Sequence, residues 1–261
     1  MPQTKKLLIA ALSALFALPA WADNAAPSSP ITANISMVNN YLFRGISRTG
    51  GKPAVQGGFD IAADNGFYIG AWGSNISWLS DKGIAINSSQ ELDAYAGIKN
   101  NFAANFNYDL GILRYNFPAT YNAGVITPDT NEIYGALGFQ WLTAKYSRSM
   151  GNFFGVPYSK GSHYLDISAN YPIPDSGVTL GAHYGKQTYN GDAANQMKLT
   201  GRDPSCADYK VSISKDISGY VLGLAYSKTN AAKGAGAYYN IPATGRDLGR
   251  AAAILSLRRT F

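Results

Sequence analysis

Charged side chains recur at alternate positions of several β-like segments, and they are the residues whose types and spacing could act on a solute. Those on the polar faces of these segments are Arg44, Asp60, Glu91, Asp93, Lys99, Asp109, Glu132, Lys145, Asp166 and Lys210. If their segments surround an interior, acids and bases can pair there as a hydrogen-bonded lattice, because buried charges require partners. The same residues could instead line a polar channel and orient a passing solute. The lattice is the simpler interpretation, and both stay open.

The two histidines offer little for nucleophilic or acid–base catalysis. His163 directly follows Ser162, so the two side chains would lie on opposite faces of a strand and could not form a nucleophile–base pair. His183 shares its face with Thr179 and Gln187, and no serine there is an obvious partner. We therefore predict no enzyme activity and no catalytic residue, with a barrel hydrolase that uses His183 as the less favoured alternative.

Metal and nucleotide sites are not indicated either. Cys206 is the single cysteine, and no cluster of histidines and cysteines has ligand spacing. The segment Gly135-Ala136-Leu137-Gly138 lies in a strand pattern and does not form a phosphate-binding turn before a helix. The sequence thus predicts no metal, no cofactor and no nucleic-acid partner. A lone cysteine cannot form an internal disulfide, and its role is left open.

The elements that would carry these residues alternate strictly between apolar and polar positions. Val55, Phe59 and Ile61 lie on one face of their segment, and Gln56 and Asp60 lie on the other. Each such segment has about ten residues, which is the length a tilted strand needs to cross a bilayer. The 28 glycines and 18 tyrosines, with 15% charged residues, suit tight turns and aromatic girdles. A β-sandwich would expose a second, more highly charged face to water.

Counting these segments predicts an all-β fold, a closed antiparallel transmembrane β-barrel of about 12 strands. The segments run from Ile31 to Ser47, Ala54 to Ala63, Phe67 to Leu79, Gln90 to Lys99, Asn105 to Phe117, Glu132 to Phe139, Trp141 to Arg148, His163 to Ile173, Val178 to Tyr189, Ala207 to Lys215, Tyr220 to Lys228 and Arg250 to Phe261. Residues 132–148 could form one strand, but bacterial barrels have even strand numbers, so we divide the segment near Gln140. Short and long links alternate, as in outer-membrane barrels.

Both ends of the chain carry targeting signals. Lys5 and Lys6 precede an apolar run, and Ala20-Trp21-Ala22 forms a small-x-small cleavage site. Residues 1–22 are therefore predicted to be a cleaved secretory signal peptide, 23–30 a short periplasmic segment and 31–261 the barrel. Phe261 ends an alternating segment that resembles the strand recognised by the barrel assembly machinery. We predict Phe261 as this assembly signal and the machinery as a partner.

Cations and aromatic rings outside the predicted lumen indicate contacts at the membrane surface. Removal of Lys5 and Lys6 leaves 20 Lys and Arg against 16 Asp and Glu, and the cations gather in the long links. They could concentrate anionic solutes at the mouth, or contact outer-membrane lipid and lipopolysaccharide; the sequence favours neither. Aromatic residues near strand ends are predicted to form interface girdles: Tyr41, Phe43, Trp72, Trp78, Phe117, Trp141, Tyr171 and Phe261.

Several motifs together resemble the TorF-type porin family, formerly a bacterial family of unknown function. They are Tyr41-Leu42-Phe43-Arg44-Gly45-Ile46-Ser47, Pro53 to Gly58, Ala71 to Asn75, Glu91 to Gly97 and Asp208 to Asp216. This resemblance implies a barrel in the outer membrane of the Gram-negative envelope, with a transport role and no agreed substrate. We therefore expect a porin-like channel for passive diffusion of small polar or anionic solutes. The alternative is a non-conducting structural or surface-binding barrel.

Overall fold

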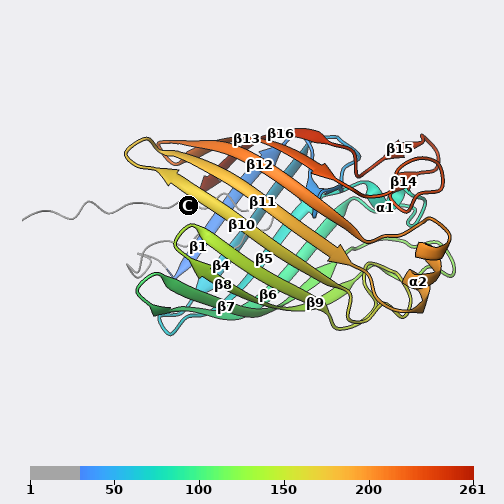
Figure 1. The fold of residues 1–261 in the computed structure, drawn as a ribbon, viewed down its shortest axis with the longest axis horizontal. Helices are drawn as coiled ribbons and strands as arrows, with labels where there is room; N and C mark the ends of the chain where they lie inside the picture. Colours follow the sequence, from blue (N-terminus) through green and yellow to red (C-terminus); the bar gives the residue numbers. More distant parts are fainter. Residues whose placement is uncertain (1–29) are drawn as a thin grey trace, which may run out of the picture.

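Twelve strands of the computed structural model, which describes residues 30–261, pair in sequence order and close into an antiparallel barrel (Figure 1). The strands are β1 (Ile31–Val38), β4 (Ala54–Ala62), β5 (Phe67–Asn75), β6 (Gln90–Ala103), β7 (Phe106–Asn116), β8 (Thr130–Phe139), β9 (Leu142–Ser149), β10 (His163–Ile173), β11 (Val178–Thr188), β12 (Cys206–Ile217), β13 (Tyr220–Thr229) and β16 (Ala252–Thr260). The barrel and its twelve strands are confirmed. The predicted signal peptide lies outside the described residues, as does all of the predicted periplasmic segment except Pro30.

The barrel closes through a short ladder between β1 and β16. Five residue pairs join these strands, from Asn34 opposite Thr260 to Val38 opposite Ser256. By contrast, β10 and β11 share eleven pairs, from His163 opposite Thr188 to Ile173 opposite Val178. The closing ladder is the shortest among the twelve strands of the described barrel.

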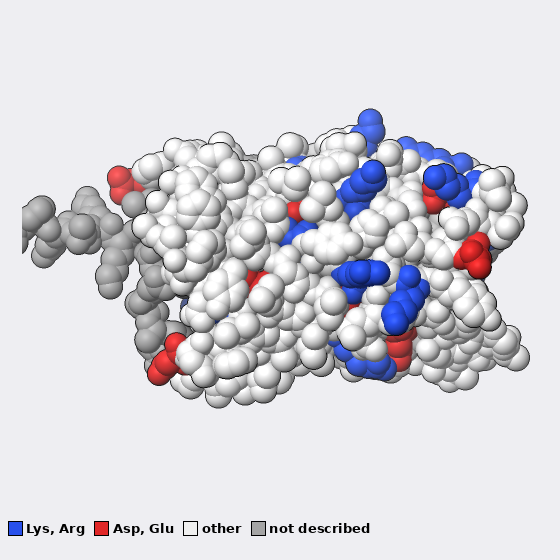
Figure 2. Space-filling view, turned by 60° about the horizontal axis from the view of Figure 1, so that its bottom comes forward, with Lys and Arg blue, Asp and Glu red and all other residues white. Residues whose placement is uncertain are grey.

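Alternation along each strand sorts apolar side chains to the outside of the barrel. On β13, Leu222 and Leu224 are 47% and 50% exposed, whereas Gly223 between them is buried. Figure 2 shows that the wall toward the end where the C-terminus lies is almost free of charge. This outer surface suits contact with lipid hydrocarbon. None of the helices in residues 30–261 is long and apolar enough to cross a membrane.

The two ends of the barrel differ in the length of their connections. At the short-turn end, the links are only a few residues long, and Gln140 takes a positive φ of 51° between β8 and β9, which confirms the predicted division there. At the long-loop end, extended connections carry the remaining elements. These are α1 (Trp78–Asp81), α2 (Asp192–Leu199), the hairpin of β2 (Leu42–Phe43) with β3 (Ile46–Ser47), and the hairpin of β14 (Asn240–Ile241) with β15 (Arg246–Asp247).

The predicted first strand, Ile31 to Ser47, is wrong beyond Val38. The chain leaves the wall there, and residues 39–53, which we call the plug hairpin, fold into the lumen. At its tip, Arg44 and Gly45 have φ angles of 48° and 76°, as the tightest hairpin turns require. A side chain at Gly45 would meet the wall, because its Cβ would lie 2.6 Å from the Cβ of Asp208.

Most of the predicted girdle aromatics lie inside the barrel instead. The girdle prediction is wrong for five of them, which are buried: Tyr41, Phe43, Trp72, Trp78 and Phe117. The other three, Trp141, Tyr171 and Phe261, are exposed on the outer surface. The error has a simple cause. Ring type shows an interface preference, but whether a ring points inward depends on strand parity and on the path of the plug hairpin.

Candidate functional site

The long-loop half of the lumen is filled by the plug hairpin and the rings that pack on it. The Phe43 ring centroid lies 5.6 Å from that of Tyr115 and 5.3 Å from that of Phe154. The guanidinium of Arg48 lies 4.4 Å from the Phe43 centroid and 4.6 Å from that of Trp78. Arg48 is therefore buried among aromatic faces. This corrects the prediction that the cations of the links, Arg48 among them, lie outside the lumen. Such contacts between a cation and ring faces are attractive and hold the plug hairpin in place.

Ionic and hydrogen-bond contacts fix the tip of the plug hairpin to the wall. Arg44 donates to Glu132 at 2.8 Å and to Gln187 at 2.6 Å, and its guanidinium lies 4.3 Å from the ring centroid of Tyr164. The Tyr41 hydroxyl donates to Glu91 at 3.2 Å. Because Glu132 is 1% exposed, its charge depends on Arg44 for compensation.

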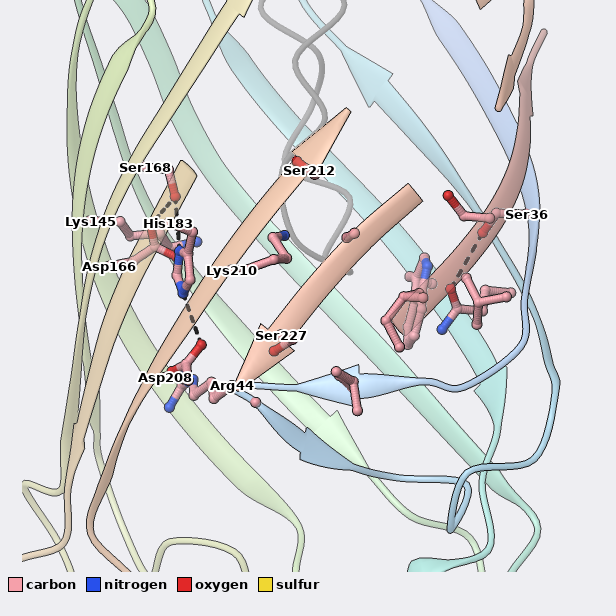
Figure 3. A pocket seen from close by; sticks show the side chains of 18 of the residues that line it. Ser36, Arg44, Lys145, Asp166, Ser168, His183, Asp208, Lys210, Ser212 and Ser227 are labelled. Carbon is pink, nitrogen blue, oxygen red and sulfur yellow. Dashed lines mark hydrogen bonds and ion pairs between the residues drawn. The ribbon is translucent and has the colours of Figure 1, made fainter. Parts of the chain in front are cut away.

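A cavity of about 220 Å³ occupies the lumen between the plug hairpin and the short-turn end. Leu42, Arg44 and Gly45 of the plug hairpin contribute to its lining. Hydroxyl and amide side chains cover much of the wall, including Ser36, Gln56, Ser168, Asn170, Ser212, Ser227 and Ser256. Figure 3 shows several of them on opposite sides of the lumen. This short-turn half thus presents many hydroxyl and amide groups and has room for small molecules.

Three cations of this cavity have no carboxylate oxygen within 4 Å in the described chain: Lys145, Lys210 and Arg258. The ammonium of Lys145 lies 3.7 Å from the ring centroid of Tyr134. Lys210 projects from β12 into the open lumen (Figure 3). The buried Nε of Arg258 has no hydrogen-bond partner. A partly enclosed cation without a counter-ion favours an anion beside it.

His183 forms a cluster with side chains from the neighbouring strands. Its Nε2 lies 2.9 Å from Asp208, and its Nδ1 lies 3.3 Å from Asp166 and 3.0 Å from the Ser168 hydroxyl. The expectation that no serine accompanies His183 is wrong, because Ser168 lies directly opposite it in the β10–β11 ladder. Only the cross-strand register reveals this pair, since fifteen residues separate the two in the sequence.

The geometry of the cluster is that of an ion pair. Both imidazole nitrogens face a carboxylate, so the ring is suited to carry two protons and donate one to each. A ring in that state has no lone pair with which to accept a proton from Ser168, whose hydroxyl already donates to Asp166 at 2.6 Å. Nucleophilic catalysis would require a different arrangement. In the described residues, no group of three or more side chains is suited to hold a metal ion.

The structure separates the ten predicted lumen residues into two groups. Five line the cavity: Arg44, Asp93, Lys145, Asp166 and Lys210. The other five do not line the cavity. Four of them are acids that accept a hydrogen bond: Asp60 from Tyr95, Glu91 from Tyr41, Asp109 from Tyr68, and Glu132 from both Tyr115 and Arg44. The fifth, Lys99, lies 5.4 Å from the Tyr68 ring centroid. A hydrogen-bonded lattice and a cavity wall therefore coexist in one lumen.

Comparison with known families gives one clear match. A family model described as "Bacterial protein of unknown function (Gcw_chp)" matches residues 22–261. None of the curated protein sequences matches the chain.

Three solved structures of porins share this fold. A KdgM porin aligns over 88% of this chain and 98% of its own, with 8% identity and a TM-score of 0.52. A NanC porin in a rhombohedral crystal form aligns over 88% and 98%, with 9% identity and a TM-score of 0.53. A KdgM porin in complex with disordered oligogalacturonate aligns over 88% and 97%, with 8% identity and a TM-score of 0.50. At these identities, the similarity concerns the fold.

Proposed function

This chain belongs to the Gcw_chp family of bacterial proteins of unknown function, and we propose that it is an outer-membrane channel for passive diffusion of small anionic solutes. The apolar outer wall and the fold shared with KdgM and NanC porins support the membrane location. The resemblance of its motifs to TorF-type porins supports a transport role. In this proposal, the long-loop end faces outward and the short-turn end faces the periplasm.

The observation that carries the proposal is the pair of ammonium groups in the cavity, Lys145 and Lys210, neither of which has a carboxylate oxygen within 4 Å in the described residues. An anionic group on a solute could approach either one without first displacing a bound carboxylate. Hydroxyl and amide groups on the surrounding wall could replace water around the rest of a polar solute. The complex of a KdgM porin with oligogalacturonate, an anionic saccharide, supports this solute class by analogy.

The plug hairpin favours one alternative, a barrel that does not conduct. Its residues fill the long-loop half, and an open path would require them to move. A hydrolase is less well supported, because both nitrogens of His183 face carboxylates.

Bilayer recordings under a salt gradient test the proposal. We expect discrete conductance steps and a reversal potential that indicates anion preference. In the variant K145Q/K210Q, the preference should fall by about five-fold per lysine, since a charge at 4 Å in water contributes about 1 kcal/mol. K215Q is the matched control, because Lys215 is exposed on the outer surface near the short turns.

Two results would contradict the channel. A folded, inserted barrel that never conducts would favour the non-conducting alternative. An anion preference that is the same in wild type and K145Q/K210Q would remove the cavity lysines from selectivity.

A further inference from the structure

Three alternate strands end in the same pattern on the outer surface, a tyrosine two residues before a cation. The pairs are Tyr146 and Arg148 on β9, Tyr184 and Lys186 on β11, and Tyr226 and Lys228 on β13. The three cations are exposed and lie within two residues of the long-loop ends of their strands. Because β9, β11 and β13 run in the same direction around the barrel, the pattern recurs at the same level of the wall.

The three cations have no protein counter-ion. No carboxylate oxygen of residues 30–261 lies within 4 Å of Arg148, Lys186 or Lys228. Figure 2 shows Lys and Arg side chains gathered in a band that crosses the wall, between the uncharged surface and the long loops. Arg114 lies near the long-loop end of β7 but pairs with Asp129 at 3.1 Å. We call Arg148, Lys186 and Lys228 the basic half-belt.

The half-belt lies next to an apolar surface on the side of the barrel formed by β9, β11 and β13. Toward the short-turn end, exposed side chains of the same strands include Leu180 at 44%, Leu222 at 47% and Leu224 at 50%. Elsewhere on the wall, Asn75 at the end of β5 and Asn39 at the base of the plug hairpin are exposed and carry no charge. On the outer surface of β9, β11 and β13, the side chains therefore change from aliphatic residues near the short turns to tyrosines and then to cations near the long loops.

We propose that the basic half-belt binds the phosphate groups of a phosphorylated lipid in the outer leaflet, namely lipopolysaccharide. Tyrosines concentrate at the boundary between hydrocarbon and headgroups, which places the cations next to them at headgroup height. Basic residues at that height attract anionic headgroups. The inference rests on the membrane location and orientation in the proposed function, and it is independent of conduction.

The test measures lipopolysaccharide retained by the refolded full chain in detergent, using native mass spectrometry. Each basic residue near an anionic membrane surface contributes roughly five-fold to binding, so R148Q/K186Q/K228Q should bind about 100-fold more weakly than wild type. K215Q removes an outward cation from the short-turn end and should bind like wild type. The heat-dependent shift in electrophoretic mobility confirms that each variant is folded.

Three results would overturn the proposal. Equal retention by wild type and the triple variant would remove the half-belt from lipid binding. Displacement of the lipid by an equal concentration of inorganic phosphate would assign the site to the free ion. A change of oligomeric state in the triple variant would assign these cations to a protein interface. Conductance of the same samples is recorded separately, so failure of the channel proposal is distinguishable.

Discussion

The two halves of the lumen are built from the same strands, yet the cations in them have different surroundings. In the long-loop half, Arg44 meets Glu132 at 2.8 Å and Arg48 is enclosed by rings. In the short-turn half, Lys145 and Lys210 face a cavity without a carboxylate partner within 4 Å. The contacts of Arg44 and Arg48 stabilise the inserted plug hairpin, whereas Lys145 and Lys210 remain available to a solute in a cavity that also contains the ion pair of His183 with Asp208.

Because of this difference, we expect one set of residues to close the lumen and another set to bind a solute. The residues that close the lumen belong mainly to one inserted segment, the plug hairpin. The residues suited to bind a solute belong to the wall strands β9 and β12. Closure and selectivity should therefore respond to different substitutions, and the following experiments test that separation.

The largest effect should follow from removal of the plug hairpin. Val38 and Ala54 pair directly across β1 and β4, so a two-residue Asn-Gly turn could replace residues 39–53 without disturbing that ladder. We expect conductance to rise several-fold, because the long-loop half loses its filling. Single-channel recording provides the measurement. Unchanged conductance would show that the plug hairpin does not limit the path.

A smaller effect should follow from breaking the ion pair at the plug tip. Arg44→Ala leaves the buried carboxylate of Glu132 uncompensated, which should destabilise the folded barrel by about 3–5 kcal/mol. Denaturant titration of the refolded barrel measures this loss. Arg114→Ala is the matched control, because its ion pair with Asp129 is exposed and should contribute at most about 1 kcal/mol. Equal losses in the two variants would contradict the distinction between buried and exposed pairs.

The smallest expected effect is a dependence of the stability of the long loops on pH. The Lys82 ammonium donates to the Tyr238 carbonyl at 2.6 Å and joins two loops. Burial, with Arg202 and Arg48 nearby, lowers the pKa of Lys82 to about 8 from 10.5. The charged form is thus disfavoured in the folded loops, so their stability should be lowest below pH 8 and should increase as pH rises from 8 to 10.5.

Protease cleavage within these loops measures that trend, after correction with an unstructured substrate for the protease's own pH dependence. Lys82→Met should remove the change in cleavage between pH 8 and pH 10.5. Cleavage that increases with pH in wild type would contradict the assigned direction.

The wall was predictable from sequence because strand alternation is a local property. Leu222 and Leu224 alternate with Gly223, and such patterns identified the barrel and its strand number. The plug hairpin was not predictable, since Tyr41, Leu42 and Phe43 continue a strand-like composition past the point where the chain turns inward. The adjacent Asn39 and Asn40 were the available turn signal.

The candidate site was predictable in its residue types but only partly in its contacts. Inward parity placed Lys145 and Lys210 together with acids on one polar face. Which cations would find a partner depends on register and on the inserted segment, neither of which the alternation determines. For the same reason, the sequence did not reveal that Ser168 lies opposite His183. It also did not reveal that the three Tyr-x-cation pairs lie at one level of the outer surface.

The short ladder between β1 and β16 gives the cylinder wall a mechanical seam. Five residue pairs of the ladder hold this junction, together with backbone hydrogen bonds between Ala33 and Phe261 and between Asn39 and Leu255. The junction joins segments more than two hundred residues apart in the sequence. Closing so long a loop costs more entropy than forming a local hairpin. The seam is therefore expected to be the last line to close as the sheet curls and the first to part under lateral tension, so a split barrel would open along β1 and β16.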